Sequence, residues 1–238
     1  MMYDPILLII AVIFMIVSML VSWQLKRKFR EYSETPLRNG MSGAEVAHQM
    51  LRDYRIYDVE VTCIPGELTD HYNPVEKTVN LSEEVYYGRN AAAAAVAAHE
   101  CGHAVQHATA YSMLELRSAL VPVQAISATI LNIINVVLLL GGIFASQIIP
   151  IKTALLIIIA CNLAFTLFAV ITLPVEFDAS KRALQWIERN RIVTASEYDM
   201  AKSALNWAAL TYVVAALGAI AQLLYYVIRY IGLTQNED

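Results

Sequence analysis

Four long apolar runs dominate the pattern of hydrophobic and polar positions along the chain. They cover residues 5–24, 130–149, 154–173 and 207–232. Each is close to the roughly 20 apolar residues with which an α-helix crosses a bilayer core of about 30 Å. One such run could be a buried core helix, but four in a chain of 238 residues predict four transmembrane helices.

The first run predicts a retained anchor and not a cleaved signal peptide. No basic segment precedes it, and no small-residue cleavage pattern follows it. A basic cluster comes directly after it instead, made of Lys26, Arg27, Lys28 and Arg30. A flank of this kind is typical of a stop-transfer segment.

The basic residues also predict an orientation. Of the 17 Lys and Arg residues, ten lie in residues 25–118 and five in residues 175–206. Two predicted crossings separate these segments, so both lie on one side, and the positive-inside rule makes that side the cytosol. We therefore expect a multi-pass protein of the cell membrane whose termini, and whose turn near residue 150, face outward.

Five parts follow from this pattern: a transmembrane helix (1–24), a cytosolic region (25–129), a transmembrane hairpin (130–173), a cytosolic helical segment (174–206) and a fourth transmembrane helix with a short tail (207–238). In the first cytosolic region, Ser42 and Glu45 form a capping-box pattern ahead of an amphipathic helix. Residues 59–64 alternate like a strand, and residues 71–82 predict a short hairpin or edge strand. The alanine-rich stretch from Ala91 predicts a closely packed helix.

Composition agrees with this picture: 58% of the residues are hydrophobic and 16% are charged. The net charge is -4, and no basic block interleaved with aromatic residues is present, so a nucleic-acid partner is not expected. The three cysteines are scattered and form no CxxC pair, which suits a reducing compartment. The spans contain a few polar residues of the kind that hydrogen-bond between helices, namely Asn132, Asn135, Asn162 and Gln222.

The chemistry of the chain concentrates in the stretch "AAAAAVAAHECGHAVQH", residues 91–107. His99 and His103 are four apart and so share one face of a helix, while Glu100 lies beside that face. A catalytic zinc ion takes three protein ligands and leaves one position open. The pattern thus predicts one catalytic Zn²⁺, with Glu100 as the base that removes a proton from the attacking water. The alternative is an inert helix, but chance produces HExxH in roughly one chain of this length in a hundred.

The third ligand must come from elsewhere. His107 lies about 12 Å beyond His99 along an unbroken helix, too far to share one ion easily. The segment after the third run offers Glu176, Asp178 and Glu188. Glu176 is favoured because it is the first carboxylate beyond the membrane, although a first-turn acid can also simply stabilise a helix N-terminus.

The motifs "AAHECGHAVQHA" and "EFDASKRAL" (residues 97–108 and 176–184) closely resemble those of the YugP-type neutral zinc metallopeptidases of bacterial membranes, and the resemblance covers essentially the whole chain. The order of motifs is more distantly similar to the HtpX and CAAX-prenyl endopeptidases. These resemblances imply that His99, His103 and Glu176 bind zinc and that Glu100 is the catalytic base. Ser180 stands where HtpX proteins usually carry an aspartate that orients a ligand histidine, so that task falls to Ser180 or to Asp178.

Together these features predict a mainly α integral membrane protein with four transmembrane helices and a membrane-proximal, zincin-like α+β catalytic region. We expect a zinc endopeptidase that acts on polypeptides, including membrane proteins in quality control. A metal-binding transporter and an inactive zinc scaffold are the alternatives. Candidates for stabilising the transition state are His71, Tyr72, Tyr86, Tyr87 and Arg182.

Overall fold

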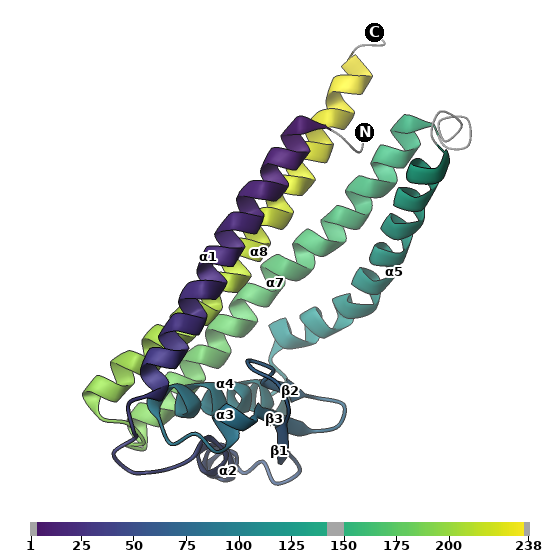
Figure 1. The fold of residues 1–238 in the computed structure, drawn as a ribbon. Helices are drawn as coiled ribbons and strands as arrows, with labels where there is room; N and C mark the ends of the chain where they lie inside the picture. Colours follow the sequence, from purple (N-terminus) through teal and green to yellow (C-terminus); the bar gives the residue numbers. More distant parts are fainter. Residues whose placement is uncertain (1–3, 142–149, 236–238) are drawn as a thin grey trace. The chain divides into compact units, whose positions relative to one another are not determined.

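The computed structural model describes residues 4–141 and 150–235 and is mostly helical (Figure 1). Its elements, in chain order, are α1 (Pro5–Ser33), α2 (Gly43–Asp53), β1 (Glu60–Ile64), β2 (His71–Asn73), β3 (Thr78–Ser82), α3 (Glu83–Tyr86), α4 (Ala91–Ala108), α5 (Ser112–Gly141), α7 (Ile151–Arg189) and α8 (Ala195–Gln235). The prediction of a mainly α protein is therefore confirmed.

The chain forms two compact units. The first comprises Met1–Ser18, Leu116–Thr172 and Tyr212–Asp238, and the second comprises Met19–Glu115 and Leu173–Thr211. Each of the long helices α1, α5, α7 and α8 has residues in both units.

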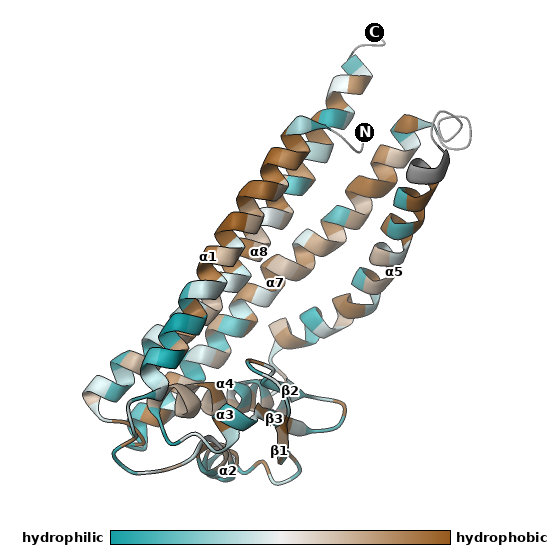
Figure 2. Ribbon diagram, in the orientation of Figure 1, coloured by the Kyte–Doolittle hydropathy of each residue, from teal (hydrophilic) through white to brown (hydrophobic). Residues whose placement is uncertain are grey.

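Among the described residues, four helices are long and apolar enough to cross a membrane, as the four apolar runs predicted. Figure 2 shows the change of character along α1, which is hydrophobic over most of its length and hydrophilic toward Ser33. The second helix, α5, begins at Ser112, well before the apolar run at 130–149, and the end of that run lies outside the described residues. Helices α7 and α8 likewise extend beyond their apolar runs, with 39 and 41 residues.

In the first unit, a polar contact joins α7 to α8, where Thr166 Oγ1 donates a hydrogen bond to the carbonyl oxygen of Ala219 at 3.2 Å. Asn162, expected to hydrogen-bond between helices, instead donates to Ile158 O of its own helix at 2.8 Å. A side-chain donor that bonds to a carbonyl group of its own helix needs no acceptor on a neighbouring helix.

The second unit contains a three-stranded sheet in the order β1-β3-β2. Strand β2 pairs antiparallel with β3, with His71 opposite Asn80, and β1 pairs with β3 in parallel. These strands confirm the strand predicted at 59–64 and the hairpin predicted at 71–82. Strand β2 is left at the edge of the sheet, so one row of its backbone groups has no strand partner.

Helix α4 is the buried centre of the second unit and contacts α2, α3, β2 and β3. Its N-terminus is capped by Asn90, whose side chain accepts a hydrogen bond from Ala93 N at 2.8 Å. All five residues of the initial alanine run, 91–95, have 0% of their surface exposed. Small side chains let neighbouring backbones approach closely, which explains why an alanine run builds a core here. The capping box predicted at Ser42 and Glu45 is present at the start of α2.

Candidate metal centre

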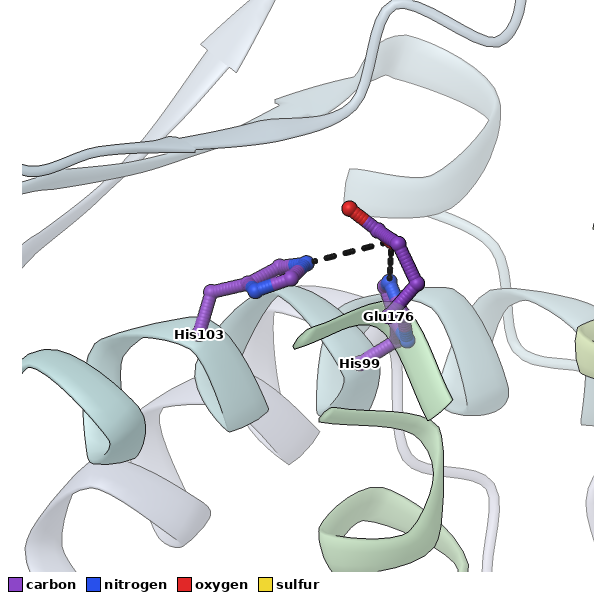
Figure 3. Close-up of side chains that lie close together, drawn as sticks. All are labelled: His99, His103 and Glu176. Atoms are coloured by element: carbon purple, nitrogen blue, oxygen red, sulfur yellow. Dashed lines mark ion pairs between the residues drawn. The ribbon is translucent and has the colours of Figure 1, made fainter. Parts of the chain in front are cut away.

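Two helices bring together three side chains with metal-binding atoms (Figure 3). His99 and His103 come from successive turns of α4, and Glu176 comes from α7. Glu176 Oε2 lies 3.3 Å from His99 Nε2 and 3.5 Å from His103 Nε2. Among the described residues, this is the one group of three or more His, Cys, Asp or Glu side chains close enough to share an ion.

The helical spacing of the histidines and a close approach of two backbones create this arrangement. Because His99 and His103 are four residues apart, their rings lie on one face of α4, with centroids 4.8 Å apart. Gly102 lies between them in sequence and packs on α7: a Cβ placed on Gly102 would lie 2.6 Å from Ala179 O. The absence of a side chain at Gly102 thus lets α7 come near enough for Glu176 to reach both imidazoles.

The spacing and type of the donor atoms fit zinc. Ligand atoms about 2.1 Å from a tetrahedral ion stand about 3.4 Å from one another. The two measured separations, 3.3 Å and 3.5 Å, bracket that value. Two imidazole nitrogens and one carboxylate oxygen are a donor set that catalytic zinc sites use, with a fourth position for water or substrate.

Each histidine has a second partner on its other ring nitrogen. Ser180 Oγ lies 3.1 Å from His99 Nδ1, and Gln106 Oε1 lies 3.0 Å from His103 Nδ1. The task of orienting a ligand histidine, left open between Ser180 and Asp178, is therefore divided: Ser180 contacts His99, while Asp178 Oδ2 accepts a hydrogen bond from Gln106 Nε2 at 2.9 Å.

Gln106 did not emerge from the sequence pattern. It is fully buried, with 0% of its surface exposed, in a helix that is otherwise mostly apolar on its buried sides. The signal that points to it is its position three residues after His103, since residues three apart on a helix are neighbours.

Glu100 is buried beside the two histidines, with 8% of its surface exposed. Burial raises the pKa of its carboxyl group above the ordinary value, against the opposing charges of His99 and His103. For His103, burial lowers the pKa, but the hydrogen bond with Glu176 and the charge of Glu100 outweigh burial and leave the pKa raised. A carboxyl group with a raised pKa is suited to accept and return a proton near neutral pH.

The remaining candidates have other partners. His107 Nδ1 lies 2.8 Å from the hydroxyl of Tyr72, which comes from β2. Glu188 lies twelve residues beyond Glu176 on α7, about 18 Å along the helix axis. Asp178 Oδ2 also accepts a hydrogen bond from Arg182 Nε at 2.5 Å.

The other residues considered for stabilising a transition state have partners of their own as well. His71 Nδ1 lies 2.8 Å from Thr69 O, and His71 Nε2 lies 3.2 Å from the side-chain nitrogen of Asn80. Tyr86 and Tyr87 pack edge to face. In this structure His71 therefore contacts its own loop and strand β3, and the two tyrosines contact each other.

Comparisons with known proteins agree with the geometry. A family model described as "Putative neutral zinc metallopeptidase" matches residues 7–231. The "Putative membrane protease YugP" of Bacillus subtilis (strain 168) is 37% identical over 215 residues, which are 90% of this chain and 92% of that protein. No solved structure matches the chain.

Proposed function

Because the chain belongs to the family described as "Putative neutral zinc metallopeptidase", we propose that it is a membrane-embedded zinc endopeptidase. It would hydrolyse internal peptide bonds at a single zinc ion held by His99, His103 and Glu176, with Glu100 as the base. The observation that carries the proposal is the convergence of three ligand atoms within 4.8 Å of one another. The Glu176 oxygen lies 3.3 Å and 3.5 Å from the two imidazole nitrogens, close to the separation of about 3.4 Å in tetrahedral zinc sites, and the carboxyl group of Glu100 is buried beside them.

The reaction assigns a distinct task to each residue. A zinc ion held there would supply Lewis-acid chemistry, polarising the scissile carbonyl and making water a stronger nucleophile near neutral pH. His99 and His103 from α4 and Glu176 from α7 would hold the ion. The Glu100 carboxylate takes one proton as water attacks the carbonyl carbon, and returns it to the amine nitrogen as the C–N bond breaks. The raised pKa of Glu100 brings its proton affinity closer to the working pH.

The distribution of basic residues supports a cytosolic site. His99 lies in the segment 25–118 and Glu176 in 175–206, the two segments that together hold fifteen of the seventeen Lys and Arg residues. We therefore place the site at the cytosolic side of the cell membrane, in a zincin-like region formed by α4 and the small sheet. The bilayer is then a constant partner, and membrane proteins or partly unfolded polypeptides are the substrates we infer.

Metal analysis together with a cleavage assay tests the proposed activity. The full chain and the variant Glu100→Gln would be purified in detergent, analysed for bound metal and incubated with an unfolded, fluorescently labelled polypeptide. We expect about one zinc ion per chain in both proteins, and cleavage by the wild type alone. Zinc in both without cleavage by either indicates an inactive scaffold, and no zinc in either refutes the metal site.

The natural cysteines allow a test of orientation. Cys63 is exposed in β1, whereas Cys101 and Cys161 are buried. A membrane-impermeant thiol reagent should label Cys63 in inverted vesicles and leave it unlabelled in intact spheroplasts. The variant Cys63→Ser provides the background, and labelling in intact spheroplasts would place the site on the outer side instead.

The physiological substrates can be approached by comparing the proteomes of cells that carry the wild type or Glu100→Gln. We expect membrane proteins to accumulate in the Glu100→Gln cells. An unchanged membrane proteome would remove the quality-control role and leave the catalytic proposal intact.

A further inference from the structure

We propose that Gln106 is a positioning residue that holds the ring of His103 in the tautomer needed for zinc and links that ring to the backbone beside Glu176. This inference rests on the proposed zinc site and adds a residue that is not itself a ligand. Three hydrogen bonds carry it: two partners, Val175 and His103, are buried, and the third, Asp178, is partly buried.

The directions of these bonds follow from the chemistry of the partners. Gln106 Nε2 lies 2.8 Å from Val175 O and 2.9 Å from Asp178 Oδ2. A peptide carbonyl and a carboxylate only accept hydrogen bonds, so the NH₂ group of the amide must face them and donate both of its hydrogens. The amide oxygen is thereby left facing His103 Nδ1 at 3.0 Å.

The tautomer of His103 then follows. An amide oxygen has no hydrogen to give, so His103 Nδ1 must carry the proton in this contact. The neutral ring then has its lone pair on Nε2, which faces Glu176 at 3.5 Å and is the atom that would bind zinc. Because Gln106 is fully buried, water does not compete for its amide.

The same amide also forms a hydrogen bond between the two helices that carry the ligands. Val175 directly precedes Glu176, so the bond to Val175 O ties α4 to α7 at the ligand itself. Asp178 is held in turn by Arg182 Nε at 2.5 Å, and the Arg182 guanidinium lies over the ring of Tyr111 at 5.8 Å. The Asp178 oxygen that accepts from the amide therefore also accepts from a guanidinium that packs on Tyr111.

His99 offers an internal comparison because its Nδ1 faces a hydroxyl group. Ser180 Oγ can donate or accept, so its contact at 3.1 Å is compatible with either tautomer of His99. Ser180 is also partly exposed, and a water molecule can take the place of its hydroxyl. We therefore expect zinc binding to depend more on Gln106 than on Ser180.

Zinc affinity measured by chelator competition, on the full chain in detergent, tests this difference. Gln106→Met keeps the length of the side chain and removes all three hydrogen bonds. We expect it to weaken zinc binding by tenfold or more, in the range found for residues that orient metal-bound histidines. Ser180→Ala is the matched comparison, with an expected loss of less than tenfold. Equal affinity of Gln106→Met and the wild type would overturn the proposal.

A second variant separates orientation of the imidazole from general packing. In Gln106→Glu combined with Asp178→Asn, the total charge is kept and the introduced carboxylate still accepts from His103 Nδ1. It can no longer donate to Val175 O, and the introduced amide cannot both donate to that carboxylate and accept from Arg182 Nε where Asp178 Oδ2 stood. Because the acceptor for His103 is kept while the bond to Val175 O is lost, we expect zinc affinity to fall by less than tenfold. A loss as large as that of Gln106→Met would show that the acceptor for His103 is not what matters.

Thermal unfolding of the metal-free proteins reports their folding separately. If Gln106→Met does not fold, the double variant decides alone, with a tenfold loss counting against the proposal. A wild-type chain that binds no zinc would refute the proposed function itself, a result distinct from all of these.

Discussion

The close contact between Gly102 and Ala179 predicts that a side chain at position 102 weakens zinc binding. In Gly102→Ala the new Cβ would lie 2.6 Å from Ala179 O and 3.2 Å from both Ala179 C and Cα. All three are backbone atoms, so no side-chain rotation can relieve the contact. To reach an ordinary separation of about 3.4 Å from the carbonyl oxygen, α4 and α7 must move apart by about 0.8 Å locally.

This displacement reaches the ligands because Glu176 lies one turn before Ala179 on the same helix. The separations of 3.3 Å and 3.5 Å between Glu176 Oε2 and the two imidazole nitrogens would grow to about 4 Å. Three ligands at that spacing no longer match a tetrahedral ion with bonds of about 2.1 Å. We expect zinc binding to weaken by at least tenfold, or about 1.4 kcal/mol.

The effect on stability should be smaller than the effect on zinc. Overpacking costs about 1–3 kcal/mol, while replacing glycine by alanine inside a helix returns about 1 kcal/mol. The metal-free variant should therefore unfold with a free energy about 0–2 kcal/mol below that of the wild type. Zinc affinity by chelator competition and thermal unfolding of the metal-free protein measure the two effects.

Gly232→Ala is the matched control, since Gly232 lies within α8 and a Cβ there meets nothing within 4 Å. It adds the same methyl group to a helix and should leave zinc affinity unchanged. A Gly102→Ala variant that binds zinc as tightly as Gly232→Ala would refute the argument that this backbone contact sets the ligand spacing.

Three further predictions address other parts of the second unit. Replacing His107 by alanine removes its hydrogen bond with Tyr72 and should cost about 1 kcal/mol of stability, with zinc content unchanged in metal analysis; loss of zinc would make His107 a ligand. Replacing Ser42 by alanine removes an N-cap and should cost about 1 kcal/mol in thermal unfolding; no loss would mean that the cap in α2 is replaceable. Burial raises the pKa of Asp70 despite the hydrogen bonds from Ser82, so the stability that its protonated form contributes is present below about pH 4 and is lost as the pH rises through the folded pKa. The melting temperature of Asp70→Asn minus that of the wild type should therefore increase between pH 4 and pH 7. A decrease in this difference would contradict the expected effect of Asp70.

Local features of this protein were readable from its sequence because they depend on neighbouring residues. The apolar runs predicted the four long helices, since a helix that crosses a bilayer needs a continuous apolar surface. The capping box at Ser42 and the alternation at 59–64 predicted α2 and β1. The four-residue spacing of His99 and His103 predicted their common face, because helical geometry alone determines it.

The third carboxylate required the tertiary structure. Glu176, Asp178 and Glu188 all follow the third apolar run, and nothing in their local sequence states which one faces α4. That choice depends on the angle and distance between two helices whose facing residues are more than seventy positions apart in the chain. The close approach at Gly102 sets the distance and turns Glu176 toward the histidines, while Asp178 faces Gln106.

The buried partners of the histidines were likewise decided only by packing. In the sequence, Gln106 is one more polar residue in "HAVQH". The structure shows that its amide donates to two acceptors on α7, Val175 O and Asp178. His107, one position later, points to Tyr72 on β2 instead. One residue of helix turns a side chain by about 100°, so adjacent positions meet different neighbours, and only the tertiary structure determines what those neighbours are.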